Sequence, residues 1–445
     1  MLLLAHFDAL VIGFGKAGKT LAGDIAGRGK KVAMIEKDPT MYGGTCINIA
    51  CIPTKLLSHD ALAGREYAGA VSRKDETVAK LRDKNYHNLA DSEGVTLYDA
   101  HAEFQNDREV GITMHDGSTE TLTADQIFIN TGAENAMPPV EGDVDSDKVH
   151  NSTTMIDERE LPERLVIVGG GYIGLEFATM YNAFGSDVSV IVPDDRILGR
   201  EDADIAGEIQ KTMTDSGISF LFGEYAERLD DVSESDIKVT LSSGETVTAD
   251  AVLMATGRKP LVSGLGLENT SVKLTDDGVI KVDDHLQTDA AGIWALGDVK
   301  GGYQFTYTSL DDYRIVRSKM FGDGSYTYGS RTNMLYTMFI DPPYSRVGLT
   351  AKEARDEGYD VAEGSVPMAG HPRSHVNGEL RGLFKAVVDK GSGKILGAHL
   401  FGVNSEELVN MVKMAMDHDI PYTALRDQMY NHPVMSEVFN TLFDV

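Results

Sequence analysis

The sequence predicts an α/β protein made of two similar parallel-sheet units followed by a smaller α+β domain. Two observations predict this architecture. A strand, a Gly-x-Gly-x-x-Gly turn, a helix and a second strand follow one another at residues 9–36 and again at 165–192. This strand–helix–strand order is typical of a parallel sheet. From about Thr332 onward, strand-like segments surround amphipathic helices instead, which predicts a domain of a different kind.

Size and composition limit the possible functions. The 445 residues are enough for two to four domains, and 42% hydrophobic and 25% charged residues are ordinary for a globular protein. The formal net charge of −28 argues against nucleic-acid partners and against anionic membrane surfaces, because both attract basic patches. Residues 1–8 lack a basic region and a long apolar run, so we expect no export signal, no membrane span and a cytoplasmic location.

The first glycine turn predicts a dinucleotide site. Gly13 and Gly15 make the tight bend and let a pyrophosphate approach the backbone, while Gly18 lets the helix pack on the strand. The second strand ends in Glu36, 18 residues after Gly18, where an acid can bind a ribose hydroxyl. Because strand, helix and terminal acid are all present, we expect a bound dinucleotide.

The second glycine turn predicts a second dinucleotide. Gly169, Gly171 and Gly174 repeat the spacing, but the following strand ends in Val192 rather than in an acid. Acids favour a free ribose hydroxyl and arginines favour a 2′-phosphate, so both NADH and NADPH stay open. Both residue types follow the strand closely, as Asp194, Asp195, Arg196 and Arg200.

The cysteines predict a redox pair. The chain has only two, Cys46 and Cys51, five positions apart, and a bridge between them closes a loop too small to stabilise the fold much. A pair that opens and closes on the first turns of one helix explains the spacing better than two inert thiols, since the helix end lowers a thiol pKa. No metal site is expected, because two further ligands are absent nearby. Lys55 lies about one turn after Cys51 on the same face. Two dinucleotides beside a dithiol imply an electron relay.

Three further signals follow. The strand ending in Thr-Gly at 131–132 is echoed at 256–257, which suggests a duplicated unit. Asp298 caps a later apolar strand, and its alternative role is a helix N-cap. His432 precedes Glu437 by five residues, so the carboxylate could orient the imidazole for proton transfer; the alternative is a surface histidine.

Together these motifs resemble the flavoprotein pyridine nucleotide–disulfide oxidoreductases, which include dihydrolipoyl dehydrogenase, glutathione reductase and mercuric reductase. The resemblance covers essentially the whole chain in the family's order, from the first fingerprint to the final HP-x-x-SE. Residues 13–20, 41–48 and 304–307 look closest to the bacterial reactive-chlorine-resistance reductases.

The resemblance implies an α/β fold with two Rossmann-like FAD/NAD(P)-binding domains plus a C-terminal α+β dimerisation domain. It also implies a homodimer whose active site is shared between subunits. The implied segments are an FAD-binding part with the redox pair, an NAD(P)-binding domain, a second FAD-binding part and a dimerisation domain, at residues 1–148, 149–265, 266–330 and 331–445.

The resemblance also implies catalytic roles. Cys51 would be the flavin-proximal thiol and Cys46 the thiol that meets the acceptor. Lys55 and Glu176 would pair beside the flavin N5 atom, and Tyr172 would cover the nicotinamide pocket.

Proton transfer and cofactor binding follow from the same resemblance. His432 and Glu437 would form the acid–base dyad acting on the partner's active site. The residues toward FAD would be Gly13, Gly15, Gly18, Glu36, Thr131, Gly132, Asp298, Gln304, Phe305 and Thr306. Those toward the NADH or NADPH pyrophosphate would be Gly169, Gly171 and Gly174. Further cofactor contacts would be Gly44, Thr45, Ala102, Ile173, Gly257 and Arg258.

Differences from the sequences of related enzymes reduce the number of possible electron acceptors. Glutathione reductases carry a substrate-binding arginine where this chain has Gly23, and mercuric reductases add a C-terminal cysteine pair that is absent here. Two kinds of acceptor stay open, a disulfide such as lipoamide and a metal ion such as Cu(II). The enzyme would accordingly act either in oxidant defence or as a dihydrolipoyl dehydrogenase. The cysteine pair argues against an oxidase or peroxidase. The His–Glu dyad argues against a flavin-bound redox sensor.

Overall fold

The computed structural model describes residues 5–445, which fold as two units made of segments distant in sequence. The first unit holds residues 5–56, 69–136 and 257–331, and the second holds 57–68, 137–256 and 332–445. The four-segment domain division stays a prediction. The expectation about an export signal rests partly on residues 1–4, which lie outside the described residues.

The sheet of the first unit is built around the strand that precedes the first glycine turn. Its strands are β1 (Ala5–Ile12), β2 (Val32–Glu36), β3 (Val95–Phe104), β4 (Glu109–Met114), β5 (Thr119–Ile129) and β17 (Ile293–Ala295). β1 pairs in parallel with β2 and β5, and residues 9–12 are fully buried. Such an apolar run suits the centre of a parallel sheet, which is covered on both faces. β3 and β17 extend the sheet in parallel, and β4 joins β3 to β5 in an antiparallel meander.

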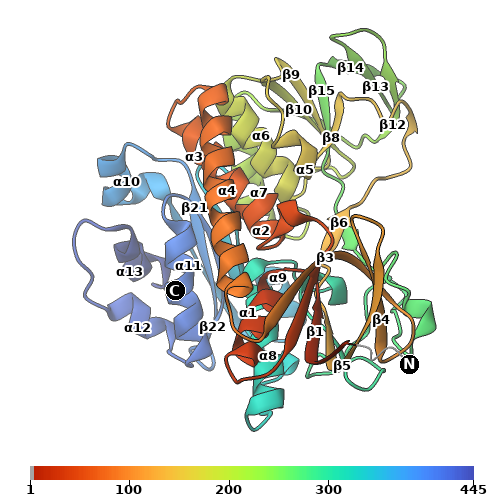
Figure 1. The fold of residues 1–445 in the computed structure, drawn as a ribbon. Helices are drawn as coiled ribbons and strands as arrows, with labels where there is room; N and C mark the ends of the chain where they lie inside the picture. Colours follow the sequence, from red (N-terminus) through yellow and green to blue (C-terminus); the bar gives the residue numbers. More distant parts are fainter. Residues whose placement is uncertain (1–4) are drawn as a thin grey trace. The chain divides into compact units, whose positions relative to one another are not determined.

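Helices and short segments complete the first unit. Helix α1 packs against α8 and against the sheet, and both helices come from segments far apart in sequence (Figure 1). The strands β6 (Ala133–Asn135) and β16 (Arg258–Pro260) form an antiparallel pair. The helical segments are α1 (Lys16–Ala26), α2 (Thr45–Asn48), α3 (Cys51–Leu62), α4 (Tyr67–Ala90), α8 (Thr306–Phe321), η1 (Pro39–Met41), η2 (Leu267–Asn269), η3 (Gly297–Lys300) and η4 (Tyr328–Ser330), of which α3 and α4 run into the second unit.

The second unit repeats the parallel sheet. Strands pair in the order β11–β10–β9–β15–β8, all in parallel, and a meander of β12, β13 and β14 follows with β7 at its edge. The strands are β7 (Glu141–Gly142), β8 (Val149–Asn151), β9 (Arg164–Val168), β10 (Asp187–Val192), β11 (Ser219–Phe222), β12 (Ala226–Asp231), β13 (Ile237–Leu241), β14 (Thr246–Ala249) and β15 (Ala251–Met254). The helices are α5 (Ser152–Met155), α6 (Tyr172–Phe184) and α7 (Ala203–Asp215). The predicted repeat of the βαβ unit is therefore confirmed.

An antiparallel sheet forms the C-terminal part of the second unit. Its strands pair in the order β18–β19–β22–β21–β20, and helix α11 packs on β19 and β22. The strands are β18 (Leu335–Met338), β19 (Tyr344–Gly348), β20 (Val361–Pro367), β21 (Leu383–Asp389) and β22 (Ile395–Phe401). The helical segments are α9 (Ala351–Asp356), α10 (Pro372–Asn377), α11 (Ser405–Asp417), α12 (Tyr422–Asp427), α13 (Val438–Leu442), η5 (Met368–Gly370) and η6 (Met435–Glu437). The predicted change of fold after Thr332 is thus confirmed.

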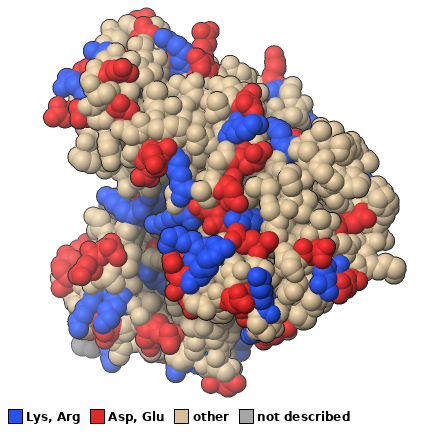
Figure 2. All heavy atoms as spheres, turned by 180° about the vertical axis from the view of Figure 1, so that it is seen from behind, with Lys and Arg blue, Asp and Glu red and all other residues tan. Residues whose placement is uncertain are grey.

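The surface carries charges of both signs. Figure 2 shows both acidic and basic side chains on the face turned away from the viewer in Figure 1. Within residues 5–445, no helix is long and apolar enough to cross a membrane.

Candidate active site

The first glycine turn is closed against the end of strand β5. Gly13 has a φ of +98°, and a Cβ atom there would lie 2.4 Å from the Asn130 carbonyl oxygen, so only glycine fits. A Cβ on Gly15 or Gly18 would lie 2.5 or 2.8 Å from the Asn130 Oδ1 atom. Asn130 is 4% exposed; its Oδ1 accepts a 2.9 Å hydrogen bond from the Gly18 N–H, and its Nδ2 donates one of 2.7 Å to the Leu296 carbonyl. All three glycines thus pack on one residue, to which sequence reasoning gave no role.

Glu36 ends β2 beside this turn. Its Oε2 accepts a 2.9 Å hydrogen bond from the Phe14 N–H and its Oε1 one of 3.1 Å from the Asp38 N–H. Burial raises the pKa of Glu36, although these hydrogen bonds oppose it. Helix α1 begins at Lys16, so its positive end and the carboxylate flank the same turn. This is the arrangement that an adenosine diphosphate group requires, so the residues present fit the adenosine half of FAD.

Two predicted FAD contacts lie beside the C-terminal end of β5. The Thr131 hydroxyl donates a 2.7 Å hydrogen bond to the Leu261 carbonyl, and Gly132 has a φ of +78°. A Cβ on Gly132 would meet open space, so the backbone is accessible there. Ala102 is buried within β3.

Other predicted FAD contacts come from residues 257–306. Burial raises the pKa of Asp298, in η3, and lowers the pKa of Arg258, whose guanidinium donates to the Ala133 carbonyl. Gly257 precedes it with a φ of +105°. Gln304 is half-buried.

Helix α8 presents Thr306 at its first position and Phe305 as its N-cap. The ring of Phe305 stacks between those of Tyr303 and Tyr307, with centroids 6.3 and 5.1 Å away. The hydroxyl of Thr306 lies 3.6 Å from the sulfur of Cys51. This contact connects the C-terminal segment of the first unit to the dithiol.

The two cysteines lie on separate helices, which corrects the prediction of a single helix. Cys46 is on α2, which ends at Asn48, and Cys51 begins α3. The reason is Pro53, which has no N–H and is tolerated only in the first turn of a helix. A helix continuous from Thr45 would have placed this proline in its interior.

The two cysteines are not joined by a disulfide, and their thiols differ in pKa. A hydrogen bond from Cys46 lowers the pKa of Cys51 to about 6; burial opposes this shift, while Thr306 and the Lys55 ammonium add to it. The same thiol–thiol hydrogen bond and burial raise the pKa of Cys46 above its usual range. The dithiol therefore releases its first proton from Cys51. Lys55 lies one turn further along α3, where its Nζ is 3.4 Å from the Thr54 hydroxyl.

Side chains that sequence reasoning missed hold the loop before Cys46. The Asn48 amide donates 3.0 Å hydrogen bonds to the carbonyls of Tyr42 and Gly44, and its oxygen accepts one of 2.9 Å from Arg82 on α4. Lys19 of α1 donates to the Gly43 carbonyl at 3.0 Å. These bonds fix the loop, although the sequence assigns no role to Lys19, Asn48 or Arg82.

Two further predicted contacts occupy this loop. Gly44 has a φ of +82°, and a Cβ on it would lie 2.8 Å from the Gly15 Cα. Thr45 begins α2. The loop that precedes Cys46 therefore lies directly against the first glycine turn.

The second glycine turn lacks the side chains that close the first. Gly169 has a φ of +118°, and its Cβ would lie 2.5 Å from the Ala255 carbonyl oxygen. A Cβ on Gly174 would lie 2.0 Å from the Gly169 carbonyl oxygen, so α6 packs closely on the turn. A Cβ on Gly171 would meet open space, and Ile173 follows in the first turn of α6. This turn leaves its backbone accessible to a pyrophosphate, so it fits a nicotinamide dinucleotide.

The residues that could select the nucleotide differ from those around Glu36. Val192 is 3% exposed at the end of β10. Arg196 donates to the carbonyls of Gly199 and Glu201 at 2.8 and 3.4 Å, so it is bound to its own loop.

Tyr172 and Glu176 lie on the first turns of α6. The Tyr172 hydroxyl donates a 2.9 Å hydrogen bond to Glu201. Glu176 accepts one of 2.8 Å from the Phe339 N–H. Lys55 and Glu176 belong to different units, and their pairing stays a prediction.

His432 and Glu437 are brought together as the spacing predicts. The histidine Nδ1 lies 2.9 and 3.0 Å from the two carboxylate oxygens. The His432 side chain is 63% exposed, so its ring is free to meet another group. A carboxylate on Nδ1 orients an imidazole for proton exchange at Nε2.

The described residues contain no group of three or more His, Cys, Asp or Glu side chains placed to hold a metal ion. The two glycine turns, with a dithiol beside the first, are the arrangement expected of a redox protein that uses two dinucleotides.

Comparisons with known proteins specify the family. The pattern of the pyridine nucleotide-disulphide oxidoreductases matches residues 7–312, and that of their dimerisation domain matches residues 334–443. The chain belongs to the pyridine nucleotide–disulfide oxidoreductase family. It is an NAD(P)H-dependent flavoprotein oxidoreductase, since this family uses FAD and NAD(P)H, and the dimerisation domain indicates a homodimer.

Several relatives match along nearly the whole chain. The chain is 45% identical to the probable pyridine nucleotide-disulfide oxidoreductase RclA of Escherichia coli (strain K12), over 99% of each. It is 31% identical to dihydrolipoyl dehydrogenase of Mycobacterium tuberculosis (99% and 98% covered) and 30% identical to mercuric reductase of Bacillus cereus (97% and 70%). The Cu(II) complex of HOCl-induced flavoprotein disulfide reductase RclA from Escherichia coli has a TM-score of 0.96 at 44% identity, over 99% of both chains. The chain is thus an RclA-like flavoprotein disulfide reductase.

Proposed function

We propose that this enzyme passes electrons from NADH or NADPH, through FAD and the Cys46–Cys51 pair, to an oxidised acceptor during reactive-chlorine defence in the cytoplasm. Cu(II) and a disulfide are the acceptors that its chemistry and relatives favour. When bound, FAD accepts a hydride from the nicotinamide and passes two electrons to the disulfide. The cysteines and the His432–Glu437 pair carry out the remaining steps, which are thiol exchange and proton transfer.

The inequality of the two thiols carries the proposal. Cys51 has the lowered pKa and contacts Thr306 at the start of α8. Cys46 has the raised pKa and lies on α2, directly after the loop that Asn48 and Lys19 hold. A thiol with a lowered pKa is held as a thiolate near neutral pH, which suits a flavin-proximal role. Cys46 then needs a base before it attacks an acceptor.

The His432–Glu437 pair supplies that base in the proposal, acting on the partner subunit's dithiol. Glu437 on Nδ1 holds the imidazole so that Nε2 can take the Cys46 proton. In this role the homodimer is required for turnover, because each active site is completed by the other subunit.

The electrons balance for both acceptors. NAD(P)H and one proton reduce the Cys46–Cys51 disulfide to the dithiol. The dithiol then reduces one disulfide by exchange, or two Cu(II) ions to two Cu(I) ions with release of two protons, and the Cys46–Cys51 disulfide reforms. Copper is a substrate in this account, and the protein does not retain it as a cofactor.

The likeness to RclA supports copper and chlorine defence. That relative is described as HOCl-induced, and its Cu(II) complex shares this fold. Thiolates bind Cu(I) well, so a dithiol is a suitable reductant and first ligand for the ion.

The remaining site residues have proposed roles. Lys55 would pair with Glu176 and stabilise negative charge that develops on the flavin, and Tyr172 would cover the nicotinamide pocket. The first glycine turn, Glu36 and Asp298 bind FAD; the second turn binds NAD(P)H.

The experiment is anaerobic oxidation of NADH and NADPH by the holoenzyme with Cu(II) or with lipoamide. Cu(I) is trapped by a chromogenic chelator and compared with a Cys46→Ser variant that retains FAD. We expect Cu(II)-dependent oxidation with two Cu(I) per nucleotide in the wild type only. Oxidation no faster with copper than without it, or an equal rate in the variant, would refute copper reduction through the dithiol.

A dihydrolipoyl dehydrogenase is the second candidate. The His432–Glu437 geometry favours it, because exchange with a dithiol substrate needs a proton shuttle. Lipoamide turnover that exceeds copper turnover in the same assay would support this candidate. A redox sensor would instead turn over slowly with every acceptor.

A further inference from the structure

A buried carboxylate lies behind the residue proposed to cover the nicotinamide pocket. Glu201 is 3% exposed, in the loop between β10 and α7. Its Oε1 accepts hydrogen bonds from the hydroxyls of Tyr172 at 2.9 Å and Tyr336 at 2.6 Å. Its Oε2 accepts one from the Tyr344 hydroxyl at 2.6 Å and pairs with Arg346 at 3.3 Å. One carboxylate therefore binds three phenols and a guanidinium.

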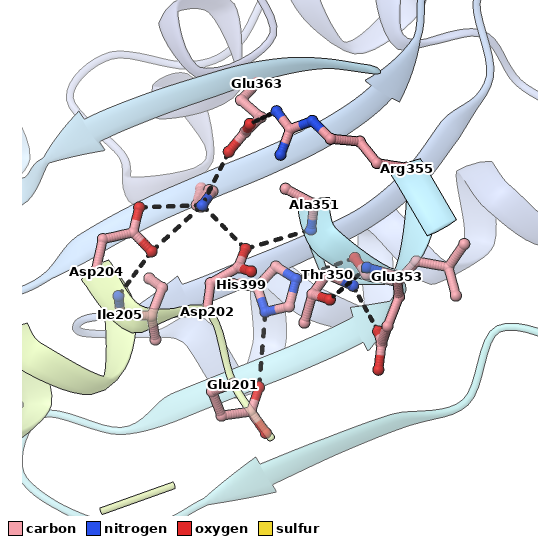
Figure 3. Close-up of polar contacts among 12 residues, drawn as sticks. Glu201, Asp202, Asp204, Ile205, Thr350, Ala351, Glu353, Arg355, Glu363 and His399 are labelled. Carbon is pink, nitrogen blue, oxygen red and sulfur yellow. Dashed lines mark hydrogen bonds and ion pairs between the residues drawn. The ribbon is translucent and has the colours of Figure 1, made fainter. Parts of the chain in front are cut away.

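The partners of Glu201 come from two parts of the fold. Tyr172 lies on α6 of the nucleotide-binding part, whereas Tyr336 is on β18 and Tyr344 on β19 of the C-terminal sheet. The ring of His399, from β22, faces the carboxylate in Figure 3, and its Nδ1 lies 3.8 Å from Oε2. The carboxylate thus joins the nucleotide-binding part to the dimerisation domain.

Glu201 is a charged acceptor. Burial raises the pKa of a carboxyl group, but His399, Arg346 and the phenols outweigh it and lower the pKa of Glu201 to about 2. The group is therefore ionised at working pH. Hydrogen bonds to a charged acceptor are stronger than those between neutral groups.

The loop that carries Glu201 is fixed by a second buried charge. The Lys385 ammonium lies 2.9 Å from Asp202, 3.0 Å from Asp204 and 2.9 Å from Glu363. Figure 3 shows these three carboxylates converging on one nitrogen beside the Glu201 loop. The carboxylate therefore has little freedom to follow a moving partner.

Among the phenols on Glu201, Tyr172 is the most exposed. Tyr336 and Tyr344 are buried, while Tyr172 is half-buried at the first position of α6. Its ring packs on Tyr336 with centroids 5.2 Å apart. When Tyr172 moves away, Tyr336 still occupies Oε1, so the carboxylate keeps a donor and the movement stays reversible.

We propose that Glu201 is a positioning residue that holds Tyr172 closed over the nicotinamide pocket and links opening of the pocket to the dimerisation domain. The inference rests on the proposed role of Tyr172. A nucleotide that enters must displace the ring and break its hydrogen bond to Glu201. The apparent affinity is therefore reduced by the fraction of molecules that are closed.

A double-mutant cycle tests this coupling. The dissociation constants of NAD+ and of a non-reacting reduced analogue are measured by calorimetry on oxidised, FAD-loaded enzyme. Tyr172→Phe keeps the ring and removes the hydroxyl, and Glu201→Gln keeps the shape and removes the charge. We expect each single variant to bind about tenfold more tightly. In the Tyr172→Phe background, Glu201→Gln should then have no further effect.

Tyr181→Phe is the matched control. Tyr181 lies on the same helix, and its buried hydroxyl donates to the Met155 carbonyl at 2.7 Å, away from Glu201. This variant should bind nucleotide as the wild type does. If Glu201→Gln misfolds, Tyr336→Phe replaces it: Tyr172 then has Oε1 to itself, and binding should weaken.

The outcomes separate the two proposals. Unchanged affinity in Tyr172→Phe would refute the covering role of Tyr172. A changed affinity there, with no change in Glu201→Gln or with the same change in both backgrounds, would refute only the positioning role of Glu201. Neither result depends on the acceptor, so failure of copper or disulfide reduction would be seen separately.

Discussion

The two nucleotide turns share one backbone plan but differ at the residue that ends their second strand. The first glycine of each turn donates its N–H to the residue just before that position, at 2.8 Å in the first turn and 3.0 Å in the second. That position holds Glu36 in the first turn, where the carboxylate accepts two backbone N–H groups. The second turn holds the buried Val192, which offers no acceptor.

A second difference lies under the glycines. Asn130 and Ala255 occupy equivalent positions, since each donates its N–H to the end of the central strand, at 2.8 and 2.9 Å. The Asn130 side chain also ties α1 to the end of β17 through two hydrogen bonds. The methyl group of Ala255 cannot do this.

The difference matches the two kinds of cofactor. The side chains of Glu36 and Asn130 cross-link the first turn, so binding of a nucleotide there should require little reorganisation of the protein. The second turn is held by backbone contacts, and the half-buried Tyr172 begins helix α6 directly after it. We expect the first to retain FAD through many turnovers and the second to exchange its nucleotide on each.

The largest effect should come from the dithiol, which lies on the first unit. Cys46→Ser should lower acceptor reduction by about a thousandfold or more, because Cys46 is the thiol that we propose to meet the acceptor. FAD should stay bound and reducible by NAD(P)H, since both nucleotide turns are intact. Stopped-flow absorbance of the flavin beside steady-state turnover measures the two separately. Turnover that survives the change would rule out the dithiol relay.

The next largest effect should break the first turn alone. Asn130→Ala leaves the Gly18 N–H and the Leu296 carbonyl without their partner, at a cost of about 1–3 kcal/mol for each buried group. We expect loss of FAD during purification and a lower melting temperature, with nucleotide affinity of any FAD-loaded fraction unchanged. FAD per subunit and thermal unfolding report this.

Asn182→Ala is the matched control for that substitution. Asn182 lies on α6, and its exposed amide donates to the Ser216 carbonyl at 3.1 Å. FAD content should stay complete. Equal FAD retention in both variants would mean that Asn130 does not set the difference between the turns.

The sequence was sufficient for the fold because its strongest signals are local. A buried strand, glycines at fixed spacing and a following helix can be seen in a single stretch, and the structure confirms both repeats. The break between α2 and α3 was also visible in principle, through Pro53. The spacing of the two cysteines alone predicts one helix, and only the position of Pro53 predicts the break between them.

The supporting residues were not predictable in the same way. Asn130, Arg82 and Glu201 act on partners 29 to 166 positions away in the chain. No local pattern marks a polar residue that is buried by such partners. Their hydrogen bonds become apparent only once the fold brings the segments together.

A smaller effect, on the preference between NADH and NADPH, is expected at the second turn. Val192→Glu restores the acid that the first turn has, so a 2′-phosphate should be repelled and a free ribose hydroxyl accepted. We expect the ratio of kcat/KM for NADH over NADPH to rise about tenfold. Val192→Gln is the uncharged control and should change the ratio less. An unchanged ratio in both would place nucleotide selection outside this position.

The smallest effect concerns the thiolate beside the first turn. With the Cys51 pKa lowered to about 6, its thiolate is present above that pH and is lost as the pH falls through it. In the proposed relay, the Cys51 thiolate lies beside the flavin of the two-electron-reduced holoenzyme and produces a thiolate-to-flavin absorbance at long wavelength. This absorbance should therefore fade below about pH 6. Thr306→Val removes the hydroxyl 3.6 Å from the sulfur, so the pKa should rise by about half a unit and the absorbance should fade at higher pH.

Thr20→Val is the matched control for this titration. It removes a hydroxyl that donates to the Lys16 carbonyl on α1, so the midpoint should stay in place. A midpoint near the ordinary thiol pKa in the wild type would contradict the assignment of Cys51 as the acidic thiol. A midpoint unmoved in Thr306→Val would instead leave Cys46 and Lys55 as the groups that hold the thiolate. The dithiol would then be tuned within its own loop and helix, independently of the segment that begins α8.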